Sequence, residues 1–296
     1  MASQHDTIAP VPTQTPLFHG LSNLRYSRQG MIKDIQQVTQ RHLLVYWANQ
    51  RGAIDKSDVC GFGDLLQGRS DADIDLLLQS PGGDIDVAEK LVYLCRARAK
   101  TFRVIVPESA KSAATLIALA GDVIMMSDTS ELGPIDPQVI VTTADGNTLM
   151  RPAASFLDGI ESIKKQADID GKLSPAYFPL LVNLDAALLD YCKKSILRAQ
   201  RFAVKWLRES QCKDSPTKAR QIAGKLADPK RYLSHGAVID HAEARKLGLK
   251  VLYVPPDEDL WQRVWRLHCR YEVDSQQEKF AKVFESSDVS LALALG

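Results

Sequence analysis

Hydrophobic positions follow two different periods along the chain. Uninterrupted apolar runs, which are typical of strands buried on both faces of a parallel sheet, predict strands at 36–47, 73–79, 102–106, 123–126 and 250–254. Apolar residues spaced three or four positions apart predict helices at 84–97, 112–120, 183–208 and 240–247. Strands and helices therefore alternate, and this order predicts an α/β domain with a parallel sheet, right-handed crossover helices and one long helix in its C-terminal half.

The two ends of the chain do not follow this pattern. Residues 1–30 are rich in Pro, Thr, Gln and Ser, a composition that predicts a flexible N-terminal arm. The α/β domain is assigned to residues 31–255, and residues 256–296 are interpreted as a polar C-terminal tail. The ending SLALALG is too short to anchor in a membrane.

Composition narrows the functional class. The 296 residues are 45% hydrophobic and 25% charged, as in an ordinary globular protein, and the formal net charge of +1 gives no reason to expect a nucleic acid or an anionic membrane as partner. The N-terminus shows no apolar core of signal-peptide length. Five cysteines without metal-ligand spacing predict free thiols in a reducing compartment, so we expect a cytoplasmic protein without metal or cofactor.

Two strand ends carry candidate chemistry. Gly82 and Gly83 follow the apolar run 73–79 and precede a helix. Glycine permits positive φ and close approach to backbone N–H groups, which suits an oxyanion, but an ordinary strand-to-helix turn uses glycine for the same reason. Neither a GxGxxG nor a Walker sequence is present, so the pair does not predict a nucleotide site.

Ser112 stands where the next strand gives way to a helix. A serine there is ordinarily a helix N-cap, although Ser109 is also available for that role. Sites in parallel sheets form at the carboxyl ends of the strands, and neighbouring strands would bring Ser112 beside Gly82 and Gly83. A nucleophile beside backbone donors is the minimum equipment for acyl transfer.

The residues around these strand ends resemble the serine dehydrogenase proteinase family of Clp-fold serine peptidases, relatives of signal peptide peptidase A and of ClpP. The matching blocks are LQSPGG (78–83), SAKSAATLIALAGD (109–122) and LGPIDPQ (132–138), with looser likeness at RPAAS (151–155), KKSI (193–196), SH (234–235) and EARKLGL (243–249). The resemblance covers roughly residues 36–254 and implies a ClpP/crotonase-like fold. It also implies Ser112 as nucleophile and an oxyanion hole at Gly82, Gly83 and Ala113, with the N–H groups of Gly83 and Ala113 donating.

The general base stays open at this point. Clp peptidases carry a histidine in the segment that here reads LGPIDPQ and contains none, whereas signal peptide peptidases use a desolvated lysine. The candidates in this chain are Lys164, Lys165, Lys172, Lys194 and His235. The resemblance ranks His235 and Lys194 above the others, although a helix lysine is usually exposed and a loop histidine is usually structural.

Two aspartates near the matched blocks, Asp122 and Asp136, would orient a base, bind the substrate backbone or cap a turn, and the turn is favoured for Asp122. Taken together, these features predict a cytoplasmic serine endopeptidase that acts on extended or unfolded peptide, forms a homo-oligomer and needs a partner for any energy-dependent unfolding. The alternatives are a crotonase-like acyl-CoA enzyme and a catalytically degenerate scaffold of the same fold.

Overall fold

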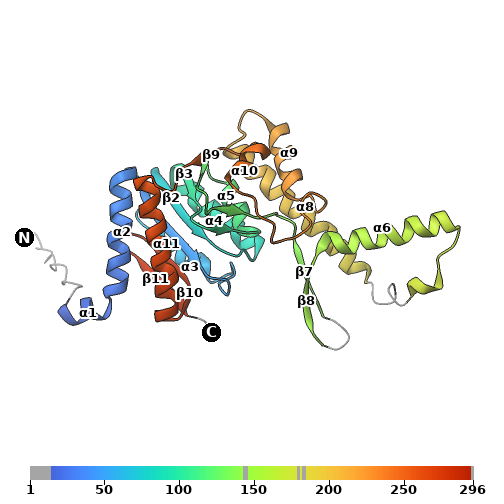
Figure 1. Cartoon of the computed structure of the whole chain (residues 1–296), viewed down its shortest axis with the longest axis horizontal. Coiled ribbons are helices and arrows are strands. Elements are labelled where there is room, and N and C mark those ends of the chain that lie inside the picture. The colour runs from blue at the N-terminus through green and yellow to red at the C-terminus, as the bar shows by residue number, and fades with distance from the viewer. Residues whose placement is uncertain (1–14, 143–145, 179–180, 182–184, 295–296) are drawn as a thin grey trace, which may run out of the picture.

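A mixed but mainly parallel sheet forms the centre of the molecule (Figure 1). The computed structural model describes residues 15–142, 146–178, 181 and 185–294. Within these residues the sheet has seven strands, in the order β11 (Ser290–Ala294), β10 (Phe280–Glu285), β1 (His42–Ala48), β2 (Ala72–Gln79), β3 (Ala99–Ile105), β5 (Val123–Met126) and β9 (Val251–Tyr253). From β1 to β9 all pairings are parallel, and β10 and β11 add an antiparallel hairpin at the β1 edge. The predicted α/β class with a parallel sheet is confirmed.

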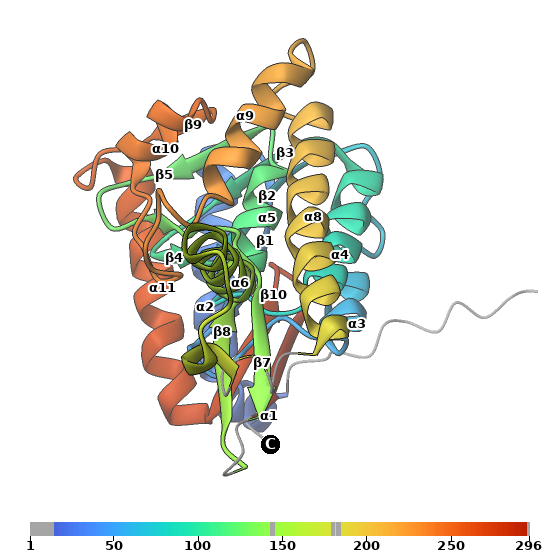
Figure 2. The same ribbon diagram turned by 90° about the vertical axis from the view of Figure 1, so that its right-hand side faces the viewer.

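Helices cover both faces of the sheet (Figures 1 and 2). One face packs against α2 (Asn23–Thr39) and α11 (Asp259–Glu278). The other packs against α3 (Asp58–Leu65), α4 (Ile85–Arg98), α5 (Ala113–Leu119), α8 (Ala186–Glu209), α9 (Pro216–Leu226) and α10 (His241–Leu247). The core strands therefore read as continuous apolar runs, because both of their faces are buried.

A second, smaller unit projects from this body (Figure 1). It consists of the hairpin β7 (Gln138–Thr142) and β8 (Thr148–Pro152), the helix α6 (Ala153–Asp170) and a short 3-10 helix at Pro175–Tyr177. Its small core is formed by Val139, Ala153 and Cys192, and the last of these comes from the N-terminal half of α8. Ile140 and Met150 of the hairpin are largely exposed.

The N-terminal arm expected at 1–30 is wrong for the described part of that segment. Residues 1–14 lie outside the described residues, but α1 (Pro16–Leu21) and the N-terminal part of α2 fall within the region assigned to the arm. Arg28 of α2 is 1% exposed and donates to Glu285 at 2.9 Å and to Asp274 at 2.6 Å. Because α2 buries an ion pair as well as apolar residues, its sequence has a polar composition and hides the helix. Because α2 continues to Thr39, the first strand begins at His42 rather than at residue 36.

The predicted tail at 256–296 is also wrong. This segment contributes α11 to one layer and the strands β10 and β11 to the sheet, and β9 is therefore not the last strand. Every residue of β10 is buried, including Lys282, which lies 2.6 Å from Asp55 and 2.8 Å from Asp58. Charged residues that are buried in pairs interrupt the apolar run by which a sequence reveals a core strand.

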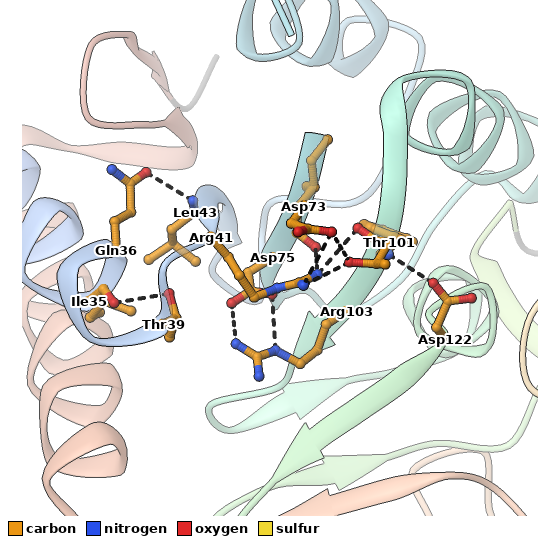
Figure 3. A network of polar contacts seen from close by, with 12 residues as sticks. Ile35, Gln36, Thr39, Arg41, Leu43, Asp73, Asp75, Thr101, Arg103 and Asp122 are labelled. Atoms are coloured by element: carbon orange, nitrogen blue, oxygen red, sulfur yellow. Dashed lines mark hydrogen bonds and ion pairs between the residues drawn. The ribbon is translucent and has the colours of Figure 1, made fainter. Parts of the chain in front are cut away.

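The amino ends of the strands are joined by a network of charged and polar groups (Figure 3). Asp75 on β2 has no exposed surface and accepts hydrogen bonds from Arg41, at 2.5 Å, and from Arg103. Arg41 and Thr101 also engage Asp73 at the start of β2. Each charge in this network faces an opposite charge, which is the condition under which buried ions are tolerated.

None of the helices in the described part of the chain combines the length and the hydropathy that crossing a bilayer requires.

Candidate active site

Ser112 stands at a sharp junction between a strand and a helix. The short strand β4 (Ser109–Ala110), which pairs with β6 (Glu131–Leu132), ends just before it, and α5 begins just after it. Its backbone has φ 52° and ψ −116°, a region that a non-glycine residue rarely occupies and that costs of order 1–3 kcal/mol. The serine hydroxyl does not cap α5, and the side chain is partly exposed. Ser112 therefore occupies the N-cap position, but its hydroxyl does not make the hydrogen bond of an ordinary N-cap.

Ser109 does not cap α5 either. Its side chain is buried, and its hydroxyl accepts a hydrogen bond from Gln79 Nε2 at 3.0 Å. The backbone N–H of Ser109 donates to Gln79 Oε1 at 2.9 Å, so both ends of one amide side chain join β2 to β4. Two further bonds, Ser80 N–H to Ser109 O and Lys111 N–H to Ser80 O, each 3.0 Å, extend this pairing up to Ser112.

The glycine pair after β2 lies directly beside Ser112. Gly82 and Gly83 have φ of +100° and +147°. A Cβ added at Gly82 would lie 2.8 Å from Ser112 Cβ, and one added at Gly83 would lie 2.4 Å from both N and O of Ile54. Backbone bonds from Ile54 N–H to Gly82 O and from Asp84 N–H to Ile54 O hold the turn from its other side. Only glycine fits either position, and the two strand ends meet as the sequence predicts.

The N–H groups in this turn are not equivalent. Gly82 N–H donates to Ser80 Oγ at 3.1 Å, so it is already occupied, and the predicted donors remain those of Gly83 and Ala113. Within the described residues, the N–H groups of Gly83 and Ala113 donate to no acceptor of the chain. Both flank Ser112: Ala113 follows it in α5, and Gly83 follows the glycine that touches it.

The loop that follows β6 packs against the first turn of α5. Thr115 Oγ1 lies 2.7 Å from Ala110 O and 2.9 Å from Gly133 O, and it accepts from Gly133 N–H at 3.0 Å. Leu132 exchanges two backbone hydrogen bonds, of 2.9 and 3.1 Å, with Ile239. The segment around residues 234–239 is thereby brought to the same side of the molecule as Ser112, although it lies more than a hundred positions away in sequence.

His235 and Asp136 meet across this contact. His235 Nδ1 lies 2.8 Å from Asp136 Oδ1, and their side chains are 28% and 9% exposed. An ionised carboxylate can only accept hydrogen bonds, so Nδ1 carries the proton and Nε2 of the neutral ring is free to accept one. Asp136 also accepts from Gln138 at 3.2 Å. Asp136 thus orients a histidine, one of the three kinds of role that the sequence left open.

The lysine candidates lie in water. Lys194 on α8 is 74% exposed and pairs with Asp190 at 2.6 Å, and Lys164, Lys165 and Lys172 are exposed as well. A lysine acts as a base only where its surroundings desolvate it. Among the five candidates, only His235 combines partial burial with a partner that fixes its orientation.

Asp122 has a structural role, as favoured from the sequence. Its carboxylate pairs with Arg96 at 3.0 Å and accepts from Phe102 N–H at 2.9 Å, which joins α4, β3 and the turn before β5.

A family profile for ClpP-like SDH-type serine proteinases matches residues 65–283, well over half of the chain. The chain belongs to this family. The matched span contains Ser112, the glycine turn and the pair formed by Asp136 and His235, and it extends through α11 into β10. The C-terminal segment is thus part of what the family shares, in agreement with its place in the central sheet.

Individual proteins similar to this chain are also known. Two uncharacterised proteins of Methanocaldococcus jannaschii are 34% identical over 188 residues (64% of this chain and 56% of theirs) and 27% identical over 181 residues (61% and 52%). The chain therefore spans about half the length of these curated relatives.

Two solved structures are also similar. One is a serine-to-alanine mutant of the membrane-bound stomatin-specific protease 1510-N, with 16% identity, TM-score 0.42 and coverage of 69% of this chain and 75% of that one. The other is a lysine-to-alanine mutant of this protease in complex with a substrate peptide, with 17% identity, TM-score 0.29 and coverage of 74% and 94%.

One group in the described part of the proteinase has side chains of metal-binding type, namely Glu108, His268 and Glu272. His268 is 2% exposed, and burial lowers its pKa to about 4. Its Nδ1 accepts from Trp47 Nε1 at 3.3 Å, so the ring proton sits on Nε2, which lies 3.7 Å from Glu108 and 4.0 Å from Glu272. A metal on Nε2 would displace this proton onto Nδ1, against the N–H of Trp47. The donor set therefore does not fit a metal.

Proposed function

We propose that this chain is a serine peptidase with Ser112 as nucleophile, the N–H groups of Gly83 and Ala113 as oxyanion hole, and His235 as base, oriented by Asp136. The observation that carries the proposal is the contact between two strand ends: a Cβ at Gly82 would lie 2.8 Å from Ser112 Cβ. Ser112 thus has a strained backbone and a hydroxyl that does not cap the helix. It lies near two backbone N–H groups that have no acceptor in the described chain. Hydroxyl nucleophiles of other hydrolases occupy a similar strained turn between strand and helix.

The reaction follows from these groups. Ser112 Oγ attacks the peptide carbonyl carbon while its proton passes to His235 Nε2, and the carbonyl oxygen takes the negative charge that the two N–H groups stabilise. The imidazolium, stabilised by Asp136, then gives the proton to the leaving amine, and an acyl ester remains on Ser112. Water repeats the sequence with the same base, which releases the carboxylic acid and the free serine.

The finer properties belong to the same proposal. The frame is of the ClpP/crotonase type, the activity is that of an endopeptidase, and the substrate is an extended or unfolded peptide that pairs through its main chain. The enzyme works in the cytoplasm as a homo-oligomer. Exposed Ile140 and Met150 on the projecting hairpin support such assembly, because apolar side chains exposed on a protruding element are typical of contact surfaces.

Intact-mass spectrometry after incubation with a fluorophosphonate tests the proposal. We expect one adduct on the wild-type protein, none on Ser112→Ala, a loss of rate of about 1000-fold or more in His235→Gln and Asp136→Asn, and an unchanged rate in Lys194→Ala. Asp128→Asn is the matched control for Asp136→Asn, since Asp128 faces His241 at 3.7 Å outside the site. A folded wild-type protein that forms no adduct would contradict the proposal and favour the degenerate scaffold. Protection by acyl-CoA against unfolding would favour the crotonase-like alternative.

A further inference from the structure

Lys111, the residue before Ser112, is held by two separate segments. Its ammonium lies 2.7 Å from Glu131 Oε1, 3.3 Å from Leu132 O and 3.2 Å from Ala237 O. Its aliphatic stem packs on Gly133, where an added Cβ would lie 2.8 Å from Lys111 Cδ. One side chain thus connects the strand that carries the nucleophile, the loop that leads to Asp136 and the segment that carries His235.

These contacts exclude Lys111 as a base. An ammonium group has three N–H donors and no acceptor, and the three oxygens around Lys111 use all of them. The side chain is 16% exposed, and Glu131 supplies the opposite charge. Lys111 is therefore a fixed cation beside the nucleophile.

The segment that carries His235 depends on few other contacts. From Leu233 to Val238, the hydrogen bonds that leave the segment within the described chain are His235 to Asp136 and Ala237 O to Lys111, and the next residue, Ile239, exchanges two backbone bonds with Leu132. The remaining bonds of these residues are internal, such as Gly236 N–H to Ser234 Oγ at 3.2 Å. Asp136 fixes the direction of the ring. The loop that carries Asp136 is bound to α5 through Gly133 and Thr115 and to Ile239 through Leu132, and Lys111 adds a direct link from the residue next to Ser112 to both the loop and the His235 segment.

We propose that Lys111 is a positioning residue of the peptidase: it holds the His235–Asp136 pair at a working distance from Ser112 by binding Glu131, Leu132 and Ala237 together. The inference rests on the proposed function, because it concerns the base assigned there. Displacing a catalytic group by about 1 Å can cost about 100-fold in rate. Lys111 touches no reacting atom, so its loss affects the rate of the covalent step and leaves the binding of the probe to the rest of the site unchanged.

The test compares the saturation kinetics of fluorophosphonate labelling in Lys111→Met, Lys111→Arg and Glu131→Gln. We expect Lys111→Met to lower the maximal labelling rate about 30- to 100-fold with less than about a twofold change in the half-saturating probe concentration. Lys111→Arg keeps the charge and several donors. On a logarithmic scale, its maximal labelling rate should therefore regain about a third or more of what Lys111→Met loses. Glu131→Gln, which leaves Lys111 in place, should lower the rate by about three- to tenfold.

Lys205→Met is the matched control, since Lys205 also pairs with a glutamate, Glu89, at 3.1 Å, but on α8 away from the site. It should label at the wild-type rate. A wild-type rate in folded Lys111→Met, or a loss confined to the half-saturating concentration, would overturn the inference while the proposed function stands. Absence of labelling in the wild-type protein would instead overturn the proposed function. Should Lys111→Met not fold, a wild-type rate in Glu131→Gln is the result that overturns the inference.

Discussion

The two ends of the parallel strands carry polar groups of opposite character. At the amino ends, buried Asp75 is enclosed by Arg41 and Arg103, and each charge has its counterpart (Figure 3). At the carboxyl ends, a serine with a strained backbone stands beside N–H groups that bind nothing in the described chain. The charged groups at the amino ends are thus paired. At the carboxyl ends the backbone is held in place, but N–H groups beside Ser112 have no acceptor in the described chain.

The difference shows how one sheet separates stability from chemistry. A buried polar group that is fully paired contributes to holding a unique structure, and breaking its pairing is costly. A polar group that is held in place but left unpaired costs free energy in the empty protein, and a ligand can recover that cost. Substitutions at the two ends should therefore affect different measurements: the unfolding free energy at the amino ends and the labelling of Ser112 at the carboxyl ends.

The largest effect on stability is expected for Asp75→Asn. This change leaves two guanidinium groups around a neutral amide, and removing one partner of a buried pair costs about 3 kcal/mol where the other partners keep some access to water. The side chains of Arg41 and Arg103 are each 18% exposed, so the lower end of the usual range applies. Urea unfolding measures the loss, and the labelling rate of Ser112 in the folded variant should equal that of the wild type.

Asp73→Asn is the control for this prediction, because Asp73 belongs to the same network but its side chain is 43% exposed. It should destabilise less than Asp75→Asn. Equal unfolding free energies for the two variants would show that burial of Asp75 adds nothing to the cost of breaking its ion pairs. The stabilising role assigned to the amino ends of the strands would then be contradicted.

The same contrast explains how much of the site could be predicted from the sequence. The glycine turn and Ser112 sit at the ends of uninterrupted apolar runs, so both the strands and their carboxyl ends were visible. The contact between His235 and Asp136 was not, since it joins residues 99 positions apart through loops without any periodic pattern. The resemblance ranked His235 and Lys194 above three other candidates without choosing between them, and only the placement of its partner singles His235 out.

The segments that were misinterpreted share one physical cause. In α2 and β10, Arg28, Lys282 and Glu285 are buried as ion pairs with partners remote in sequence. A pattern of apolar and polar residues assumes that charges face water, so it assigns such segments to an arm or a tail. Lys111 was missed for a related reason: a lysine in a polar stretch gives no sign that three oxygens from two loops surround it.

The carboxyl end can be tested with two glycines whose φ angles are both positive. Gly83 and Gly68 both have positive φ, but an added Cβ meets Ile54 at 2.4 Å in the first case and nothing within 4 Å in the second. Both alanine variants incur backbone strain, and only Gly83→Ala must move the oxyanion turn. We expect Gly83→Ala to label about 100-fold more slowly than the wild type, and Gly68→Ala to lose stability with an unchanged rate. Equal labelling rates in the two variants would remove Gly83 from the site.

The smallest effect concerns His268, which lies on the α11 face near the carboxyl ends rather than beside Ser112. Burial lowers its folded pKa to about 4 from an ordinary value of 6.5, so between these values the unfolded chain binds more protons than the native one. Stability therefore falls as the pH falls through this window, by about 1.5 kcal/mol from pH 6.5 to about pH 5.

Glu108 and Glu272 face the ring, and burial together with Glu108 raises the pKa of Glu272, so this carboxyl also begins to take up protons near the lower end of the window. His268→Gln keeps an acceptor for Trp47 and removes the histidine contribution alone, so the difference between its urea unfolding curves and those of the wild type isolates it. If stability depends on pH in this variant as steeply as in the wild type, the ring is not neutral in the native protein. The exclusion of water on the α11 face would then not extend to the carboxyl ends of the strands.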